Sequence, residues 1–270
     1  MVWIELDGAV NARDLGGLPA GDGKRIAPGV LLRSDNLQDL SPADVARLVD
    51  GIGLTTVIDL RSSKEAEAEG PSPLDAVPTV AHLHLSVLPE VGENTDVIAE
   101  ALLLKRERDR SRYPDDAMCG HYLGYLEDRP EAVTGAVRAI ADAPGAAIVH
   151  CAAGKDRTGV VIALALSAVG VPDEVVIADY AATDEKIEAI LRRLMGSSTY
   201  EGDLKDSQID RHRPRAETMK AFLEQVEAGY GGVRQWLADH GFGPGDLERL
   251  RAKLVVTDAD VVDVGAGTGS

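Results

Sequence analysis

The ten residues from His150 to Gly159, HCAAGKDRTG, carry the side chains best suited to chemistry in this sequence. Five residues separate Cys151 from Arg157, and Gly154 lets the chain between them turn tightly. A loop of this length at the start of a helix can point successive backbone N–H groups inward, where they bind a tetrahedral oxyanion. The spacing therefore predicts a phosphate-binding loop made of Ala152, Ala153, Gly154, Lys155, Asp156, Arg157 and Thr158.

Cys151 and Arg157 have complementary chemistry in such a loop. The helix terminus, the inward amides and the guanidinium of Arg157 all favour the thiolate of Cys151, which is the nucleophilic form of the side chain. Arg157 is planar and always charged, so it can hold two phosphate oxygens in a bidentate fork. We expect Cys151 to take a phosphoryl group from a phosphomonoester as a phosphocysteine, which water then hydrolyses without a metal or other cofactor.

Two neighbours of these residues are expected to assist. Thr158 is placed to hydrogen-bond the sulfur of Cys151 and ease its departure in the second step, and His150 is expected to order the loop from behind.

The departing oxygen needs a proton, and the sequence offers two places for the carboxylic acid that supplies it. Asp156, inside the loop, is the preferred candidate. Asp115 or Asp116, which follow Tyr113-Pro114, lie at a suitable distance upstream for a mobile acid loop. An aspartate at this position is also typical of a helix N-cap, so both interpretations stay open.

The flanking sequence predicts the elements that hold the loop. Residues 146–149 (AAIV) form an apolar run typical of a buried strand, and residues 158–169 predict a buried helix directly after the loop. Residues 55–60 predict a second buried strand, which closes on Asp59 and Arg61. These two side chains either form an ion pair that ties the strand end to the loop or contact the substrate.

Strand and helix patterns alternate along the rest of the chain, which predicts an α/β fold with a central, mostly parallel sheet flanked by helices. We expect one domain over residues 1–254 and a disordered tail over residues 255–270. Further strands are predicted at 30–33 and 80–86, and helices from Ser41 to Gly51 and at 97–112, 116–127, 130–142, 173–180, 183–195, 215–228, 232–239 and 244–254.

Composition narrows the partners and the compartment. The net charge of −17 argues against nucleic acid and anionic membranes as partners. The sequence also has no run of about 20 apolar residues, so we expect no integral membrane contact. Cys119 and Cys151 are the two cysteines, which indicates neither a disulfide framework nor a metal site. We expect a cytoplasmic protein, although some bacterial effectors are exported without a signal peptide.

The loop and four shorter motifs together resemble the bacterial protein-tyrosine phosphatases of the type typified by Mycobacterium tuberculosis protein tyrosine phosphatase B. The shorter motifs are residues 11–14 (NARD), 32–34 (LRS), 59–63 (DLRSS) and 178–180 (ADY), so the similarity extends over most of the chain.

The resemblance implies a cysteine-phosphatase fold with a helical lid over the pocket, at about residues 175–215, and a phosphotyrosine protein as substrate. It also implies activity that extends to phosphoserine, phosphothreonine and phosphoinositides, with Asp156 as the acid, Lys155 as a residue that widens substrate choice, and Asp59 close to the pocket. Two alternatives remain: a phosphatase for a nucleotide or sugar phosphate, and a phosphate-binding module without turnover. The sequence does not predict the oligomeric state.

Overall fold

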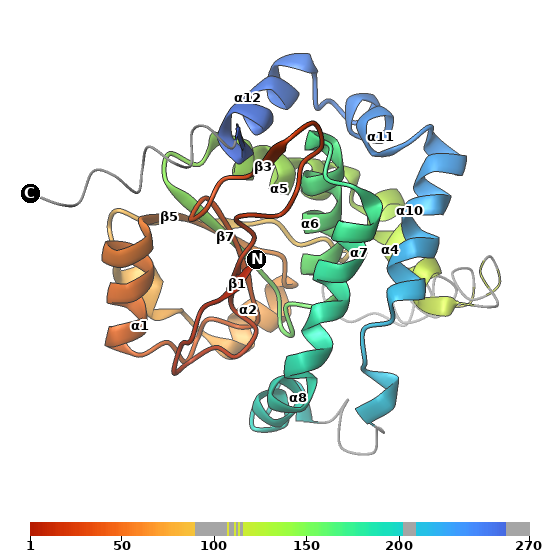
Figure 1. The fold of residues 1–270 in the computed structure, drawn as a ribbon. Coiled ribbons are helices and arrows are strands. Elements are labelled where there is room, and N and C mark those ends of the chain that lie inside the picture. Colours follow the sequence, from red (N-terminus) through yellow and green to blue (C-terminus); the bar gives the residue numbers. More distant parts are fainter. Residues whose placement is uncertain (90–106, 108–110, 112, 114–115, 202–208, 258–270) are drawn as a thin grey trace, which may run out of the picture.

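The computed structural model describes residues 1–89, 107, 111, 113, 116–201 and 209–257, and its centre is a six-stranded sheet (Figure 1). The strand order is β1-β2-β4-β7-β5-β6. The neighbours β4, β7, β5 and β6 are parallel, while β1 and β2 are antiparallel additions at one edge. The predicted α/β class with a mostly parallel sheet is confirmed. The strands are β1 (Val2–Trp3), β2 (Arg13–Asp14), β4 (Leu31–Ser34), β5 (Leu54–Asp59), β6 (Ala81–His84) and β7 (Ala146–His150).

Most helices follow the predicted segments closely, and the segment at 130–142 has the predicted bounds, whereas the helices at 63–69 and 73–76 are not predicted. The predicted helix at 97–112 lies almost wholly outside the described residues. The described helices are α1 (Pro42–Ala46), which continues as the π-helical turn η1 (Arg47–Ile52), α2 (Ser63–Glu69), η2 (Pro73–Ala76), α4 (Ala117–Asp128), α5 (Pro130–Asp142), α6 (Asp156–Val169), α7 (Asp173–Ala182), η3 (Thr183–Lys186), α8 (Ile187–Met195), η4 (Ile209–Arg211), α10 (Ala216–Tyr230), α11 (Val233–Asp239) and α12 (Pro244–Leu254).

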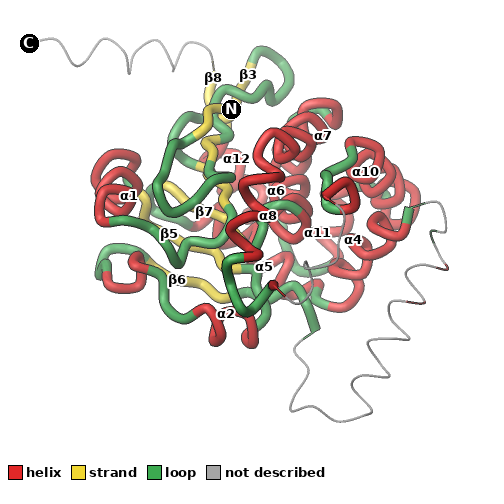
Figure 2. The backbone as a smooth tube through the Cα atoms, turned by 90° about the horizontal axis from the view of Figure 1, so that it is seen from below, coloured by secondary structure: helices red, strands yellow, loops and turns green. Residues whose placement is uncertain are grey.

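The sheet is buried on both faces, which explains why its central strands carry continuous apolar runs, such as residues 146–149 of β7, rather than an alternating pattern. Successive side chains of a strand point to opposite faces. Ile58 and Val149 pack into the core that contains α5 and α6, while Val57 and Ile148 pack into a second core with α1 and η1. Figures 1 and 2 show these helices on the two sides of the strands.

The predicted tail begins with ordered structure, so its boundary at residue 255 is wrong. Val255–Thr257 forms strand β8, which pairs antiparallel with β3 (Lys24–Ile26) as a separate two-stranded sheet. The residues of β8 are β-branched and suit a strand, but their partner is more than 200 positions away in the sequence. Residues 258–270 lie outside the described residues.

No described helix is both long and apolar enough to cross a membrane.

Candidate active site

The ends of three neighbouring parallel strands lie side by side where the phosphate loop (residues 151–157) begins. Ser34 at the end of β4 and Asp59 at the end of β5 are both register partners of His150 at the end of β7. The chain then turns through the loop into the N-terminus of α6. The predicted order of strand, loop and buried helix is observed, at the carboxyl edge of the strands where open α/β sheets bind their ligands.

The phosphate loop is held from behind by hydrogen bonds to three consecutive carbonyl groups, those of residues 152–154. Their respective donors are the backbone N–H of Asn36 at 3.0 Å, the side-chain amide of Asn11 at 2.9 Å and the guanidinium of Arg33 at 2.7 Å. A trans peptide places its N–H opposite its C=O. Because the carbonyls point back to the scaffold, the amides of the residues that follow them point into the loop, as an anion site requires.

Gly154 is required by both the backbone angle and the space around it. Its φ of +65° lies in the left-handed region, which favours glycine. A Cβ at this position would lie 2.3 Å from the carbonyl oxygen of Ser34, so no side chain fits without moving the strand end. Close packing of the loop on β4 therefore depends on this glycine.

A buried ion cluster supports the donors behind the loop. Asp179 pairs with Arg33 at 2.5 Å and with Arg13 at 2.9 Å, and all three side chains are at most 1 % exposed. Arg13 also donates to the Oδ1 atom of Asn11 at 2.6 Å. Burial, followed by repulsion from Arg33, lowers the pKa of Arg13 to about 10. The motifs around residues 11–14, 32–34 and 178–180 thus meet behind the loop and hold its shape.

In front of the loop lies a cavity of about 300 Å³, which we call the front cavity. Its floor is formed by residues 152, 153 and 155–157 of the loop. One wall is the apolar face of α8, in the predicted lid region, with Ile187, Ile190, Leu191 and Leu194 at helical spacing. Cys151 itself is 2 % exposed, so access to its sulfur is restricted. That α8 moves as a lid stays a prediction.

Arg157 is fixed by a carboxylate that the sequence analysis did not single out. Glu65 accepts hydrogen bonds from Nη1 and Nη2 of Arg157, at 2.6 and 2.8 Å. Burial opposes the charge of Arg157, but the electrostatic interaction with Cys151 and the pair with Glu65 raise its pKa above the usual value. Ser62 and Glu65 form a capping box at the start of α2, a pattern that marks a helix start but says nothing of Arg157.

Asp156, the preferred acid, lies on the floor of the front cavity and receives a phenol hydrogen bond. Tyr122 donates to Oδ1 of Asp156 at 2.5 Å, and the hydroxyl of Tyr122 is 2.7 Å from that of Tyr180. Lys155 Nζ lies 3.6 Å from the other carboxylate oxygen. Burial favours the neutral acid, but the charge of Lys155 and the bond from Tyr122 lower the pKa of Asp156 below its ordinary value.

The rival acid positions differ in what the structure describes. Asp116 is the N-cap of α4 and accepts hydrogen bonds from the backbone N–H of Met118 and Cys119 at 3.0 and 3.1 Å. Thr218 donates to its second oxygen at 2.6 Å. Both oxygens of Asp116 are therefore used in holding helices together. Asp115 lies outside the described residues.

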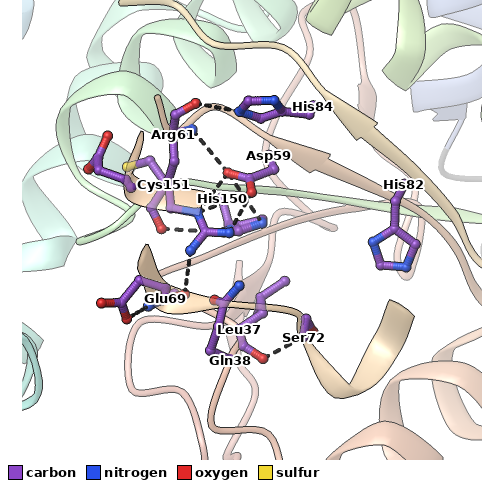
Figure 3. Close-up of polar contacts among 12 residues, drawn as sticks. Leu37, Gln38, Asp59, Arg61, Glu69, Ser72, His82, His84, His150 and Cys151 are labelled. Atoms are coloured by element: carbon purple, nitrogen blue, oxygen red, sulfur yellow. Dashed lines mark hydrogen bonds and ion pairs between the residues drawn. The ribbon is translucent and has the colours of Figure 1, made fainter. Parts of the chain in front are cut away.

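Asp59, Arg61 and His150 lie beside the loop rather than in the front cavity. Arg61 pairs with Asp59 at 2.6 Å, its backbone carbonyl is 2.8 Å from Nε2 of His84, and Nε2 of His150 is 3.7 Å from Asp59 (Figure 3). Burial lowers the pKa of His150, which favours the neutral ring. The three side chains line a different cavity, of about 510 Å³. Of the two roles expected for Asp59 and Arg61, the ion pair is the one that this structure contains.

Thr158 is fully buried in the first turn of α6. Its hydroxyl has no hydrogen-bond partner among the described residues, so the expected bond to the sulfur of Cys151 is not formed in this structure.

Comparison with known proteins agrees with this geometry. Residues 4–256 match the model of a family described as the tyrosine phosphatase family. The chain belongs to this family. The match covers the sheet from β2 to β7, the phosphate loop and the helices that surround them.

Named relatives of this phosphatase come from several bacteria. It is 29 % identical to the triple specificity protein phosphatase PtpB of Mycobacterium tuberculosis, over 94 % of this chain and 100 % of the relative. It is 30 % identical to a putative tyrosine-protein phosphatase of Cupriavidus necator, over 87 % and 83 % of the two chains, and 26 % identical to a tyrosine-protein phosphatase of Nostoc commune, over 87 % and 78 %. The predicted resemblance is confirmed, and the protein is a protein-tyrosine phosphatase.

Proposed function

We propose that this phosphatase works through a phosphocysteine on Cys151, with Arg157 as the phosphate clamp and Asp156 as the acid. The three scaffold bonds to the carbonyls of residues 152–154 carry the proposal, because they turn the amides of the loop toward the place where a phosphoryl group would lie. The pair with Glu65 leaves Nε–H and further N–H groups of Arg157 for phosphate oxygens.

The reaction consists of two displacements at phosphorus. The thiolate of Cys151 forms an S–P bond as the P–O bond to the leaving group breaks, and Asp156 gives its proton to the departing oxygen. A water molecule then attacks phosphorus, its proton passes to Asp156, and the S–P bond breaks to release phosphate and the thiolate.

The low pKa of Asp156 in the free protein must be reconciled with its role as an acid. A bound phosphoryl dianion is a like charge close to the carboxylate, and such a charge raises a carboxyl pKa. Substrate binding therefore favours the protonated form of Asp156, and its bond from Tyr122 keeps the carboxyl group in place.

The shape of the front cavity favours an aryl phosphate. The apolar face of α8 can pack against the ring of phosphotyrosine, which a sugar phosphate lacks. A specificity that extends beyond phosphotyrosine is proposed because the M. tuberculosis relative is a triple specificity protein phosphatase. Phosphoserine, phosphothreonine and phosphoinositides are the further substrates that the family resemblance implies. Both cysteines are free thiols, in keeping with action in the reducing cytoplasm.

Assays of a phosphotyrosine peptide, a phosphoinositide and a nucleotide monophosphate, side by side, test this proposal. We expect the peptide to be hydrolysed, with Cys151→Ser and Arg157→Ala each abolishing turnover, Cys151→Ser still binding the peptide, and a chelator leaving the rate unchanged. A strong preference for the nucleotide would favour the metabolic alternative, and binding without hydrolysis would favour the binding module. Full activity of Cys151→Ser would overturn the mechanism.

A further inference from the structure

Tyr200 follows α8 and contributes a phenol side chain to the front cavity. The side chain is nearly buried, because the residue is 8 % exposed. Its hydroxyl has no hydrogen-bond partner among the described residues. Among the described residues that line the front cavity, Tyr200 alone has a buried side-chain oxygen without a partner.

The ring of Tyr200 is held against the phosphate loop. It packs in a small apolar cluster with Ala152 of the loop and with Ile190 and Leu194 of α8. The turn that carries it is also fastened, because Ser197 donates a hydrogen bond to Glu69 at the end of α2. The position of the hydroxyl is therefore determined by packing on both sides of the cavity.

Tyr200 shares the lining of the front cavity with Arg157 and Glu65. Burial raises the pKa of Tyr200, with a further increase from Glu65 and opposing effects from Arg61 and Arg157. Tyr200 therefore stays a neutral O–H donor at physiological pH, in the same cavity as the guanidinium of Arg157.

A buried hydroxyl without a partner destabilises the folded protein, so its retention in a cavity calls for a ligand that satisfies it. The neighbouring Arg157 selects an anion, and a phosphate oxygen accepts hydrogen bonds from both donors at once.

We propose that Tyr200 donates a hydrogen bond to a nonbridging oxygen of the phosphoryl group that Arg157 holds, and so serves as a substrate-binding residue from the segment after α8. This inference rests on the proposed function of the phosphate loop. It also gives the segment after α8 a direct contact with the reacting group, beyond the apolar wall that α8 provides.

Tyr200→Phe is the decisive variant, because it removes only the unpaired hydroxyl. We expect kcat/KM for a phosphotyrosine peptide to fall about 10- to 100-fold, the loss of a hydrogen bond to a charged group. The inhibition constant of tungstate, a tetrahedral oxyanion, should rise in parallel. The Tm should stay the same or increase, because the substitution removes a buried hydroxyl that has no hydrogen-bond partner and destabilises the folded protein. Tyr230→Phe is the matched control, since the hydroxyl of Tyr230 contacts Glu127 outside the cavity.

The outcomes distinguish a failure of the role of Tyr200 from a failure of the proposed function. If Tyr200→Phe keeps kcat/KM and the tungstate constant within about twofold of the wild type, the role of Tyr200 is overturned and the phosphate loop is not. A fall in Tm with an unchanged tungstate constant also overturns it, because that result indicates a structural role. If the wild type neither hydrolyses the peptide nor binds tungstate, the proposed function itself fails, and the role of Tyr200 fails with it.

Discussion

Glu65 binds Arg157 end-on: each carboxylate oxygen accepts a hydrogen bond from a different terminal nitrogen of the guanidinium, at 2.6 and 2.8 Å. The same Glu65 closes the capping box with Ser62 at the start of α2. The start of this helix and Arg157, the proposed phosphate clamp, therefore share the side chain of Glu65. Burial opposes the charge of Glu65, but the bond and the charge of Arg157 lower its pKa, so it is ionised at neutral pH.

We expect Glu65→Gln to lower kcat/KM about 10- to 100-fold, because a neutral amide offers only one acceptor oxygen and the clamp loses its fixed orientation. Kinetics on a phosphotyrosine peptide measure the effect. Glu67→Gln makes the same chemical change on an exposed position of α2 and serves as the control. Equal activity of the two variants would show that Glu65 does not position Arg157.

Tyr122→Phe should move the alkaline limb of the pH–rate profile to higher pH. The acid must be protonated to act, so the rate falls as pH rises through the pKa of Asp156. The bond from Tyr122 stabilises the ionised carboxylate and lowers this pKa, and its removal must raise it. The measurement uses an aryl phosphate with a poor leaving group. The Asp156→Asn variant should lack this limb, and a limb that persists in it assigns the acid elsewhere.

Gly154→Ala should abolish turnover, because its Cβ would lie 2.3 Å from the carbonyl oxygen of Ser34 and its φ is +65°. Binding of tungstate, followed by thermal shift, should be lost as well. Gly229→Ala is the control, since Gly229 lies in α10 with open space around its Cβ position. We expect the control to keep full activity and to gain up to about 1 kcal/mol of stability from improved helix propensity. An active Gly154→Ala enzyme would refute the close packing of the loop.

Asp179→Asn should reduce the free energy of unfolding by about 3–5 kcal/mol, because it leaves the buried guanidiniums of Arg13 and Arg33 without a counter-charge. Urea denaturation measures this loss. Asp184→Asn breaks a more exposed pair with Arg213 and should cost at most about 1 kcal/mol. If the two variants unfold at the same urea concentration, the buried cluster does not stabilise the fold as described.

The sequence predicts the local elements well and the long-range contacts poorly. Apolar runs and turn residues are local signals, so the strand and helix around the loop and the bounds of α5 could be predicted. The pair of Arg13 and Asp179 joins positions 166 residues apart, and no local pattern encodes it. The contacts of Glu65 with Arg157 and of Tyr200 with the loop likewise arise only when α2 and α8 lie beside the phosphate loop in the folded protein.

The groups that hold the phosphate loop from behind depend on residues both before and after the loop in the sequence. Asn11 reaches across 142 residues to the loop, and Arg33 is itself anchored by Asp179, which emerges later in synthesis than the loop. A nascent chain or fragment that contains all of HCAAGKDRTG but lacks Asn11 or Asp179 would not hold the loop in its binding conformation, so it would have no activity. Phosphatase activity should therefore appear late, only when the whole fold has formed. An N-terminal truncation of a dozen residues should abolish the activity of Cys151, although it removes no residue of the loop.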